Sequence, residues 1–202
     1  MIRLQGLYAI TNGPRADLEP AVRAALAGGA RIVQYRDKTP DRDRRSREAA
    51  NLVQLCSRFG VPLIINDDVD LAAECGAAGV HLGTDDVDIG VALERLGTDA
   101  IIGVSCYDSL PRARQMAAQG ASYVAFGAFY PSSTKPGARI ASQNLLRDSA
   151  DLGIPRVAIG GISPDNALEL IQAGADCVAV ISALFDTVDI ESAARQFSRL
   201  FS

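Results

Sequence analysis

The sequence is poor in the residues on which many kinds of catalytic or binding site depend. It has one histidine, His81, no tryptophan, and four cysteines that lie far apart without a CxxC pair. No Ser–His–Asp or Cys–His set is evident around a single histidine, and the cysteine spacing indicates neither a zinc site nor a disulfide framework. We therefore expect reduced, buried thiols of the kind found in the cytoplasm.

Long apolar runs and an excess of positive charge are also missing. No apolar stretch reaches the roughly 20 residues that a membrane-spanning helix needs, and MIRLQGLYAITNG at the N-terminus lacks the apolar core of a signal peptide. The formal net charge of −4 argues against a nucleic-acid-binding surface. We expect a cytoplasmic protein that binds small molecules rather than nucleic acids or membranes, and its oligomeric state stays open.

Short β-branched runs alternate along the chain with segments of helical spacing. The runs, most of them apolar on both faces as in a covered parallel sheet, span residues 7–11, 32–37, 62–67, 79–83, 101–106, 123–130, 156–161 and 177–182. Helical segments include residues 18–28, 41–59, 109–119 and 164–173. Eight similar units favour a single α/β domain over residues 1–202, a (β/α)8 TIM barrel, rather than a doubly wound open sheet.

Polar residues gather at the carboxyl ends of the expected strands, where such barrels place their active sites. Asp67 and Asp86 follow neighbouring strands and could share one Mg²⁺ with substrate phosphates. Helix capping is the alternative for each carboxylate taken alone, because Asp is a preferred N-cap residue. Three cations, Arg36, Lys38 and Lys135, are expected at the same mouth to bind phosphate. The QYRDK stretch that contains two of them is, taken alone, more typical of solvated surface than of a binding site.

The ends of the last two expected strands resemble a phosphate cradle. A glycine pair at 160–161 precedes Ser-Pro at 163–164 and a helical segment, and Ile-Ser at 181–182 ends the next strand. Barrels often bind phosphate with these two loops, although a tight turn alone would also require glycine. His81 lies mid-strand and is interpreted as structural. A site rich in phosphate and metal ligands and poor in proton shuttles suits the departure of a diphosphate.

The ordered series QYRDK, INDD, GVHLGTDD, IGVS, FGAFYPSSTK, AIGGI and VIS resembles the thiamine phosphate synthase family from residue 7 to residue 182. Members of that family join a pyrimidinylmethyl diphosphate to a thiazole phosphate, forming thiamine monophosphate and releasing pyrophosphate. The family mechanism is dissociative: the diphosphate leaves first, and the thiazole nitrogen captures the resulting cation. Because that nitrogen carries no proton, no general base is needed. The resemblance implies a Mg²⁺-dependent transferase.

The resemblance also implies roles for individual residues. Mg²⁺ would be coordinated by Asp67 and Asp86, and catalysis would involve Arg36, Lys38, Ser105 and Lys135. The pyrimidine diphosphate would be bound by Gln34, Arg36, Lys38, Asn66, Ser105 and Lys135, and the thiazole phosphate by Ser132, Ser133, Thr134, Gly161, Ile181 and Ser182. Tyr35 and Asp37, from the same QYRDK stretch, are also expected to contact substrate. The chain has GTDD at 83–86 where the family usually has GQED, and Ser132 where threonine is typical.

Two other functions stay open at this stage. A thiazole tautomerase-like isomerase resembles the synthase, but it needs acid–base chemistry and not the cations of a diphosphate site. A non-catalytic barrel that binds a phosphorylated metabolite could keep the glycine-rich cradle and would have no use for paired carboxylates. Dependence on Mg²⁺ would separate the synthase from both.

Overall fold

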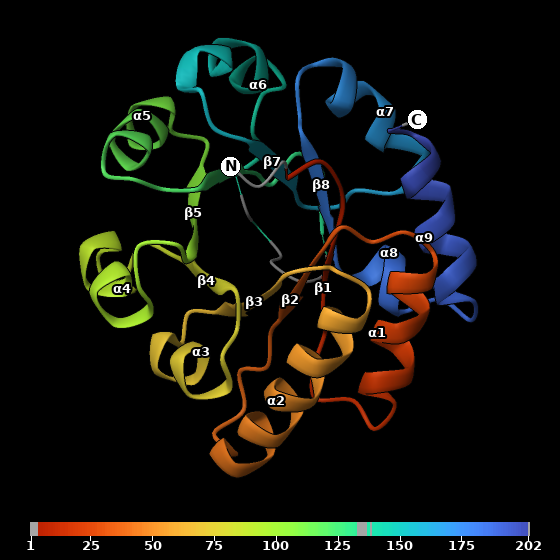
Figure 1. Cartoon of the computed structure of the whole chain (residues 1–202). Helices are drawn as coiled ribbons and strands as arrows, with labels where there is room; N and C mark the ends of the chain where they lie inside the picture. The colour runs from red at the N-terminus through yellow and green to blue at the C-terminus, as the bar shows by residue number, and fades with distance from the viewer. Residues whose placement is uncertain (1–3, 133–136, 138, 202) are drawn as a thin grey trace.

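The computed structural model describes residues 4–132, 137 and 139–201. Eight parallel strands pair in sequence order and close into a barrel, with the last strand paired to the first. They lie in the middle of Figure 1 with the helices around them. The strands are β1 (Gly6–Ile10), β2 (Ile32–Tyr35), β3 (Leu63–Asn66), β4 (Gly79–Leu82), β5 (Ile101–Tyr107), β6 (Tyr123–Phe126), β7 (Arg156–Ile159) and β8 (Cys177–Val180). The predicted (β/α)8 barrel is confirmed.

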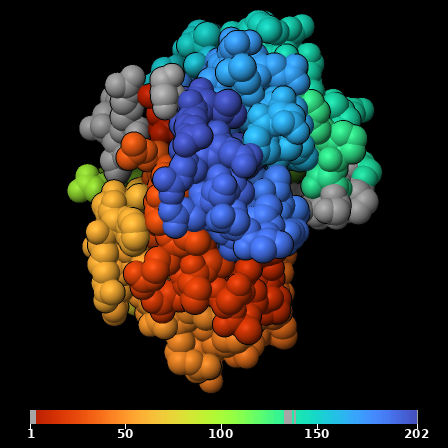
Figure 2. Space-filling view, turned by 90° about the vertical axis from the view of Figure 1, so that its right-hand side faces the viewer, coloured from red at the N-terminus to blue at the C-terminus, as the bar shows by residue number. Residues whose placement is uncertain are grey.

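The helices form an outer ring. They are α1 (Leu18–Ala27), α2 (Arg42–Arg58), α3 (Val69–Cys75), α4 (Ile89–Leu96), α5 (Leu110–Ala118), α6 (Asn144–Asp148), α7 (Pro164–Gln172), α8 (Ser182–Phe185) and α9 (Ile190–Arg199), with a 3₁₀ turn at Ala150–Leu152. The first and last long helices, α1 and α9, pack side by side and close the ring (Figure 2). Among the described residues, no helix has the length and apolar character needed to cross a membrane.

The four helical segments expected from the sequence correspond to α1, α2, α5 and α7 once their capping residues are counted. The Asp41 side chain accepts a hydrogen bond from the Arg44 N–H at the start of α2, and Ser109 does the same for the Arg112 N–H at the start of α5. Ser163 opens α7 with a reciprocal capping box to Asn166. These caps satisfy N–H groups that the first turn leaves unpaired, which is why the sequence predicted these boundaries well.

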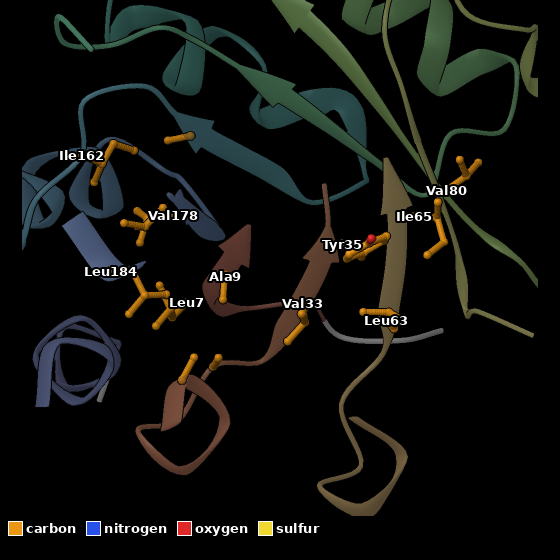
Figure 3. Packing of buried hydrophobic residues seen from close by; sticks show 14 of the residues in the cluster. Leu7, Ala9, Val33, Tyr35, Leu63, Ile65, Val80, Ile162, Val178 and Leu184 are labelled. Atoms are coloured by element: carbon orange, nitrogen blue, oxygen red, sulfur yellow. The ribbon is translucent and has the colours of Figure 1, made fainter. Parts of the chain in front are cut away.

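Alternation along the strands separates the buried residues into two layers. On β1, Leu7 and Ala9 belong to the large cluster between the strands and the helices, whereas Tyr8 and Ile10 belong to a smaller cluster inside the barrel. Figure 3 shows part of the outer cluster, including Leu7, Val33 and Leu63. Because successive side chains point to opposite faces of a strand, both faces of the sheet are packed, as its apolar sequence predicted.

The sixth strand is shorter than the sequence predicted. The apolar run at 123–130 favoured one long strand, but β6 ends at Phe126. Beyond it, the N–H groups of Phe129 and Tyr130 donate to the carbonyls of Ile159 and Gly160 at 3.1 and 3.0 Å. The loop after β6 is therefore held against the loop after β7, which brings two of the predicted phosphate-binding segments together.

Candidate functional site

A cavity of about 920 Å³ opens at the carboxyl ends of the strands. Most of the predicted site residues line it: Gln34, Arg36, Lys38, Asn66, Asp67, Asp86, Ser105, Ser132, Gly161, Ile181 and Ser182. They come from segments up to 148 positions apart, between Gln34 and Ser182, which only the closed barrel brings together. Its volume is at the upper end of the range typical of small-molecule sites.

The carboxylates at the ends of β3 and β4 include one that caps a helix and three that line the cavity, Asp67, Asp85 and Asp86. Asp68 is the N-cap of α3, where its side chain accepts from the Leu71 N–H at 2.9 Å. Asp67 and Asp86 line the cavity instead. Asp86 accepts from the Gly83 N–H at 2.6 Å and precedes α4, whose N-cap is Asp88. The capping alternative therefore holds for Asp68 and not for the pair predicted to bind metal.

Two of the cavity carboxylates lie close enough for Asp67 to affect the pKa of Asp86. Burial raises the pKa of Asp86 above its ordinary value, and the neighbouring carboxylate of Asp67 raises it further, against the opposing hydrogen bond from Gly83. Two adjacent carboxylates repel unless a proton or a cation lies between them. In the described part of the chain no cluster of three or more His, Cys, Asp or Glu side chains could hold a metal ion. A carboxylate pair of this kind has the donor chemistry that suits Mg²⁺, which commonly takes one or two carboxylates with water and substrate phosphates as its other ligands.

Two cations, Arg36 and Lys38, line the same cavity as this carboxylate pair. Lys38 Nζ lies 3.5 Å from Asp67 Oδ2, with 60% of the lysine side chain exposed. Arg36 follows β2, and the buried Thr11 hydroxyl fixes its backbone by accepting from the Arg36 N–H at 2.8 Å and donating to its carbonyl at 3.2 Å. Among the residues that the structure describes, no carboxylate pairs with the Arg36 guanidinium, which leaves its donors available to an anion.

The other end of the cavity is lined by the loops after β7 and β8. Gly160 and Gly161 have φ angles of 101° and 62°, and Ile181 and Ser182 lead into the short helix α8. In the closed strand order, β7 and β8 lie across the barrel from β3 and β4. This end of the cavity therefore presents glycine backbone and a hydroxyl opposite the charged carboxylates and cations.

These features agree with what the chain resembles. A profile of the thiamine monophosphate synthase family matches residues 7–184. The chain belongs to the thiamine monophosphate synthase family. It is 54% identical over 195 residues to the thiamine-phosphate synthase of Halorhodospira halophila, covering 96% of this chain and 93% of that protein. It is 55% identical over 201 residues to the thiamine-phosphate synthase of Methylobacillus flagellatus, covering 98% and 96%.

A solved structure supports the same assignment. The thiamine phosphate pyrophosphorylase from Pyrococcus furiosus superposes with a TM-score of 0.88 at 34% identity, covering 98% of this chain and 96% of that one. A 3-hexulose-6-phosphate synthase, at 17% identity and a TM-score of 0.75, shares the fold alone. The predicted thiamine monophosphate synthase family is thereby confirmed, and the chain is a transferase of that family.

Within this synthase barrel, Tyr35 and Asp37 do not reach the cavity, which corrects their predicted contact with substrate. The Tyr35 hydroxyl donates to Glu48 of α2 at 2.6 Å. Asp37 is buried, accepts from the N–H and hydroxyl of Thr39, and lies 2.8 Å from Arg44 of α2. Because side chains alternate along a strand, placing Gln34 and Arg36 on the cavity side turns Tyr35 and Asp37 to the helix side.

Asp37 is nevertheless expected to stabilise the synthase in a pH-dependent way. Burial alone would raise the pKa of Asp37, but hydrogen bonds from Thr39 and the Arg44 guanidinium hold it below its usual value. A lowered folded-state pKa gives stability that is present above the unfolded pKa of about 3.9 and is lost as the pH falls below it. We expect Asp37→Asn to lower the free energy of unfolding by about 1–3 kcal/mol at pH 7. Urea unfolding at pH 7 and pH 3 tests this, and an equal difference at both values would contradict it.

The glycine pair after β7 is required by the packing of the neighbouring loop. A Cβ on Gly161 would lie 2.4 Å from the Pro131 carbonyl oxygen, and one on Gly160 would lie 2.4 Å from the Ala128 Cβ. Gly161→Ala is therefore expected to push the loop after β6 outward and to cost about 1–3 kcal/mol of stability. Chemical denaturation measures the loss. Gly153→Ala is a matched control, since Gly153 also has a positive φ of 68° but nothing lies within 4 Å of its Cβ position.

Three predicted site residues, Ser133, Thr134 and Lys135, lie outside the described residues. Their expected contacts with the thiazole phosphate and the diphosphate stay predictions. The adjoining Ser132 and Gly137 line the cavity.

The barrel interior contains a polar group that the sequence prediction missed. The Tyr8 and Tyr123 hydroxyls lie 2.7 Å apart, and the Gln34 amide donates to Tyr8 at 2.8 Å. The His81 Nδ1 lies 3.0 Å from the Tyr123 hydroxyl, and its Nε2 lies 2.9 Å from Ser105 Oγ. His81 is thus hydrogen-bonded, as expected of a structural histidine, and it also lines the cavity. Two tyrosines inside otherwise apolar strands gave no signal that their hydroxyls meet.

Proposed function

We propose that this transferase joins a pyrimidinylmethyl diphosphate to a thiazole phosphate, forming thiamine monophosphate and pyrophosphate with the help of Mg²⁺. One observation carries the proposal: a single cavity has a carboxylate pair with two cations at the ends of β2 to β4 and a glycine-rich cradle across the barrel at β7 and β8. An enzyme that joins two phosphorylated substrates needs two anion-binding sites in one cavity, one on each side of the reacting atoms. The single barrel would serve as the catalytic domain, and a cytoplasmic location stays our prediction.

The charged end suits the diphosphate. The planar Arg36 guanidinium can donate to two phosphate oxygens at once, and Lys38, already paired with Asp67 at 3.5 Å, supplies a point charge next to the carboxylate pair. Mg²⁺ held by Asp67 and Asp86 would neutralise negative charge on the diphosphate oxygens. Asn66 and Ser105 would complete this end with uncharged hydrogen-bonding groups.

The cradle suits a phosphate that takes no part in bond breaking. Gly161, Ile181 and Ser182 offer backbone and hydroxyl groups without a charged side chain of their own. They would hold the thiazole phosphate so that its ring nitrogen faces the carbon that the diphosphate leaves. This arrangement lowers the entropic cost of bringing two substrates together.

The bond changes match the groups available. The carbon–oxygen bond to the diphosphate breaks with its electron pair on the leaving group, and the lone pair of the thiazole nitrogen forms the new carbon–nitrogen bond. No proton is removed in this reaction, so the site needs no general base. The one histidine, His81, can therefore be hydrogen-bonded at both ring nitrogens without preventing the reaction. Arg36 and Lys38 would contribute by stabilising the charge that develops on the departing oxygen.

The test is to mix the purified chain with both substrates and Mg²⁺ and to measure pyrophosphate and thiamine monophosphate. We expect equal amounts of the two products, and no product when Mg²⁺ is chelated. Incubation with the thiazole phosphate alone tests the isomerase alternative, for which we expect an unchanged substrate. Folded protein that binds both substrates without forming product would favour the non-catalytic alternative and overturn the proposal.

A further inference from the structure

A buried chain of hydrogen bonds crosses the barrel interior and joins two predicted substrate-binding residues. It runs from Gln34 on β2 to Tyr8 on β1, then to Tyr123 on β6, His81 on β4 and Ser105 on β5. The successive distances are 2.8, 2.7, 3.0 and 2.9 Å. Each member comes from a different strand, so the closed barrel as a whole holds the chain in place.

Tyr123 is the central link of the hydrogen-bond chain and its one member that is not among the described lining residues of the cavity. The other four side chains line the cavity, whereas Tyr123 is fully buried. Its ring stacks on His81 with centroids 5.7 Å apart and meets Tyr8 edge to face at 5.9 Å. Gly103 makes room for it, because a Cβ there would lie 1.9 Å from the Tyr123 Cζ. Tyr123 therefore acts on the cavity only through its neighbours.

Counting the available donors and acceptors shows in which direction the hydrogen bonds of this network are donated. The Gln34 amide nitrogen can only donate, so the Tyr8 oxygen accepts from it. If Tyr123 also donated to Tyr8, the proton of Tyr8, which is only 1% exposed, would have no acceptor among these side chains, whereas the half-buried Ser105 can direct its proton into the cavity. If Tyr8 donates to Tyr123 instead, each tyrosine hydroxyl accepts once and donates once. Burial raises the pKa of both tyrosines, which therefore keep their protons.

The same counting assigns the donor and the acceptor in the Tyr123–His81 and His81–Ser105 hydrogen bonds. The proton of Tyr123 is then directed to His81 Nδ1, which must be an unprotonated acceptor. In a neutral imidazole the proton then lies on Nε2, which donates to Ser105 Oγ. The hydroxyl proton of Ser105 is left for a group in the cavity.

We infer that Tyr123 is a positioning residue that sets the direction of this hydrogen-bond chain, holding His81 protonated on Nε2 and Ser105 as a donor toward the cavity. The proton placement stands on the geometry alone. Its consequence for activity rests on the proposed function: Ser105 would then donate to the pyrimidine diphosphate, and Gln34 would be held in one amide orientation. Neither effect involves the thiazole phosphate.

The proton placement is tested by ¹⁵N NMR of untagged protein labelled at histidine. Since His81 is the only histidine, one imidazole gives all the ring signals. We expect the wild type to carry its proton on Nε2, with Nδ1 accepting a hydrogen bond. Tyr123→Phe should shift the Nδ1 signal in the direction expected for the loss of one accepted hydrogen bond. A proton on Nδ1 in the wild type, or an Nδ1 signal unchanged by Tyr123→Phe, would overturn the inference, and the wild-type result decides even if the variant does not fold.

The kinetic test separates positioning from a general effect on folding. We expect Tyr123→Phe to lower kcat/KM for the pyrimidine diphosphate about tenfold, the effect of losing one buried hydrogen bond. The KM for the thiazole phosphate should change by less than about twofold. Ser105→Ala should cost at least as much as Tyr123→Phe, and the loss in the double variant should be clearly smaller than the product of the two single losses, because both changes remove the Ser105 contact. Losses that multiply would show that Tyr123 does not act through Ser105.

Tyr35→Phe is the matched control. It removes another buried tyrosine hydroxyl, one that donates to Glu48 on the helix side of β2 and not into the barrel. We expect it to leave the His81 signals and the kinetic constants unchanged. A shift of the His81 signals in this variant equal to that in Tyr123→Phe would mean that any lost tyrosine hydroxyl perturbs the imidazole, which would overturn the inference. Wild-type protein without synthase activity but with the expected imidazole signals would refute the proposed function and leave the proton placement standing.

Discussion

Arg36→Met is expected to lower kcat/KM for the pyrimidine diphosphate by about 10²- to 10³-fold, the range seen when one group that stabilises developing negative charge is removed. Methionine keeps much of the length and apolar stem of arginine but none of its donors. The backbone at this position is held by Thr11 and does not depend on the guanidinium. Steady-state kinetics at saturating thiazole phosphate and Mg²⁺ measure the effect.

Arg42→Met is the control for this change. Arg42 begins α2, is largely exposed and pairs with Glu74 at 2.6 Å on the outside of the barrel. Its replacement removes the same charge from the protein without touching the cavity, and we expect activity within about twofold of the wild type, as for surface pairs of little energetic weight. Equal losses in the two variants would show that net charge, and not the Arg36 contact, determines the rate.

Asp67→Asn and Asp86→Asn are expected to raise the Mg²⁺ concentration needed for half-maximal activity by at least about 10- to 100-fold, the range found when even a residue that supports a metal ligand is lost. An amide oxygen keeps the shape of the carboxylate but removes its charge. Asn is also compatible with the left-handed backbone of Asp67, whose φ is 65°. Titrating Mg²⁺ in the synthase assay measures the shift, and excess Mg²⁺ should restore part of the activity.

Asp68→Asn separates metal binding from helix capping. Asp68 adjoins Asp67, caps α3 and pairs with Arg45 at 2.8 Å. Asn is itself a good N-cap residue, so we expect a small loss of stability and an unchanged Mg²⁺ requirement. Full activity of Asp67→Asn and Asp86→Asn at ordinary Mg²⁺ would remove both residues from the proposed metal site.

The (β/α)8 architecture was predictable because local signals repeat. Each apolar run and each helical segment depends on residues within about one element, and eight repetitions of the same unit leave few alternative folds. The prediction of one long strand over residues 123–130 was wrong because it rested on local composition alone. The composition of this segment suits a strand throughout, but the loop after β6 turns to pair with Ile159 and Gly160, a contact that local sequence does not encode.

The kinds of residue that form the site were predictable from the sequence. Which individual residues face the cavity was only partly predictable. Polar residues at strand ends identified the carboxylate pair and its cations, yet alternation alone could not say which side of β2 faces inward. Gln34 and Arg36 face the cavity, and Tyr35 and Asp37 face α2, because the barrel closes with that register.

The sequence by itself determined the alternation of strand and helix, the helix boundaries and the polar character of one end of the barrel, all of which depend on neighbours a few residues apart. Only the tertiary structure decided which carboxylates cap a helix and which face the cavity. It alone brought the Tyr8 and Tyr123 hydroxyls, 115 positions apart in the chain, to 2.7 Å. Such contacts depend on the register and closure of all eight strands together, and no local pattern carries that information.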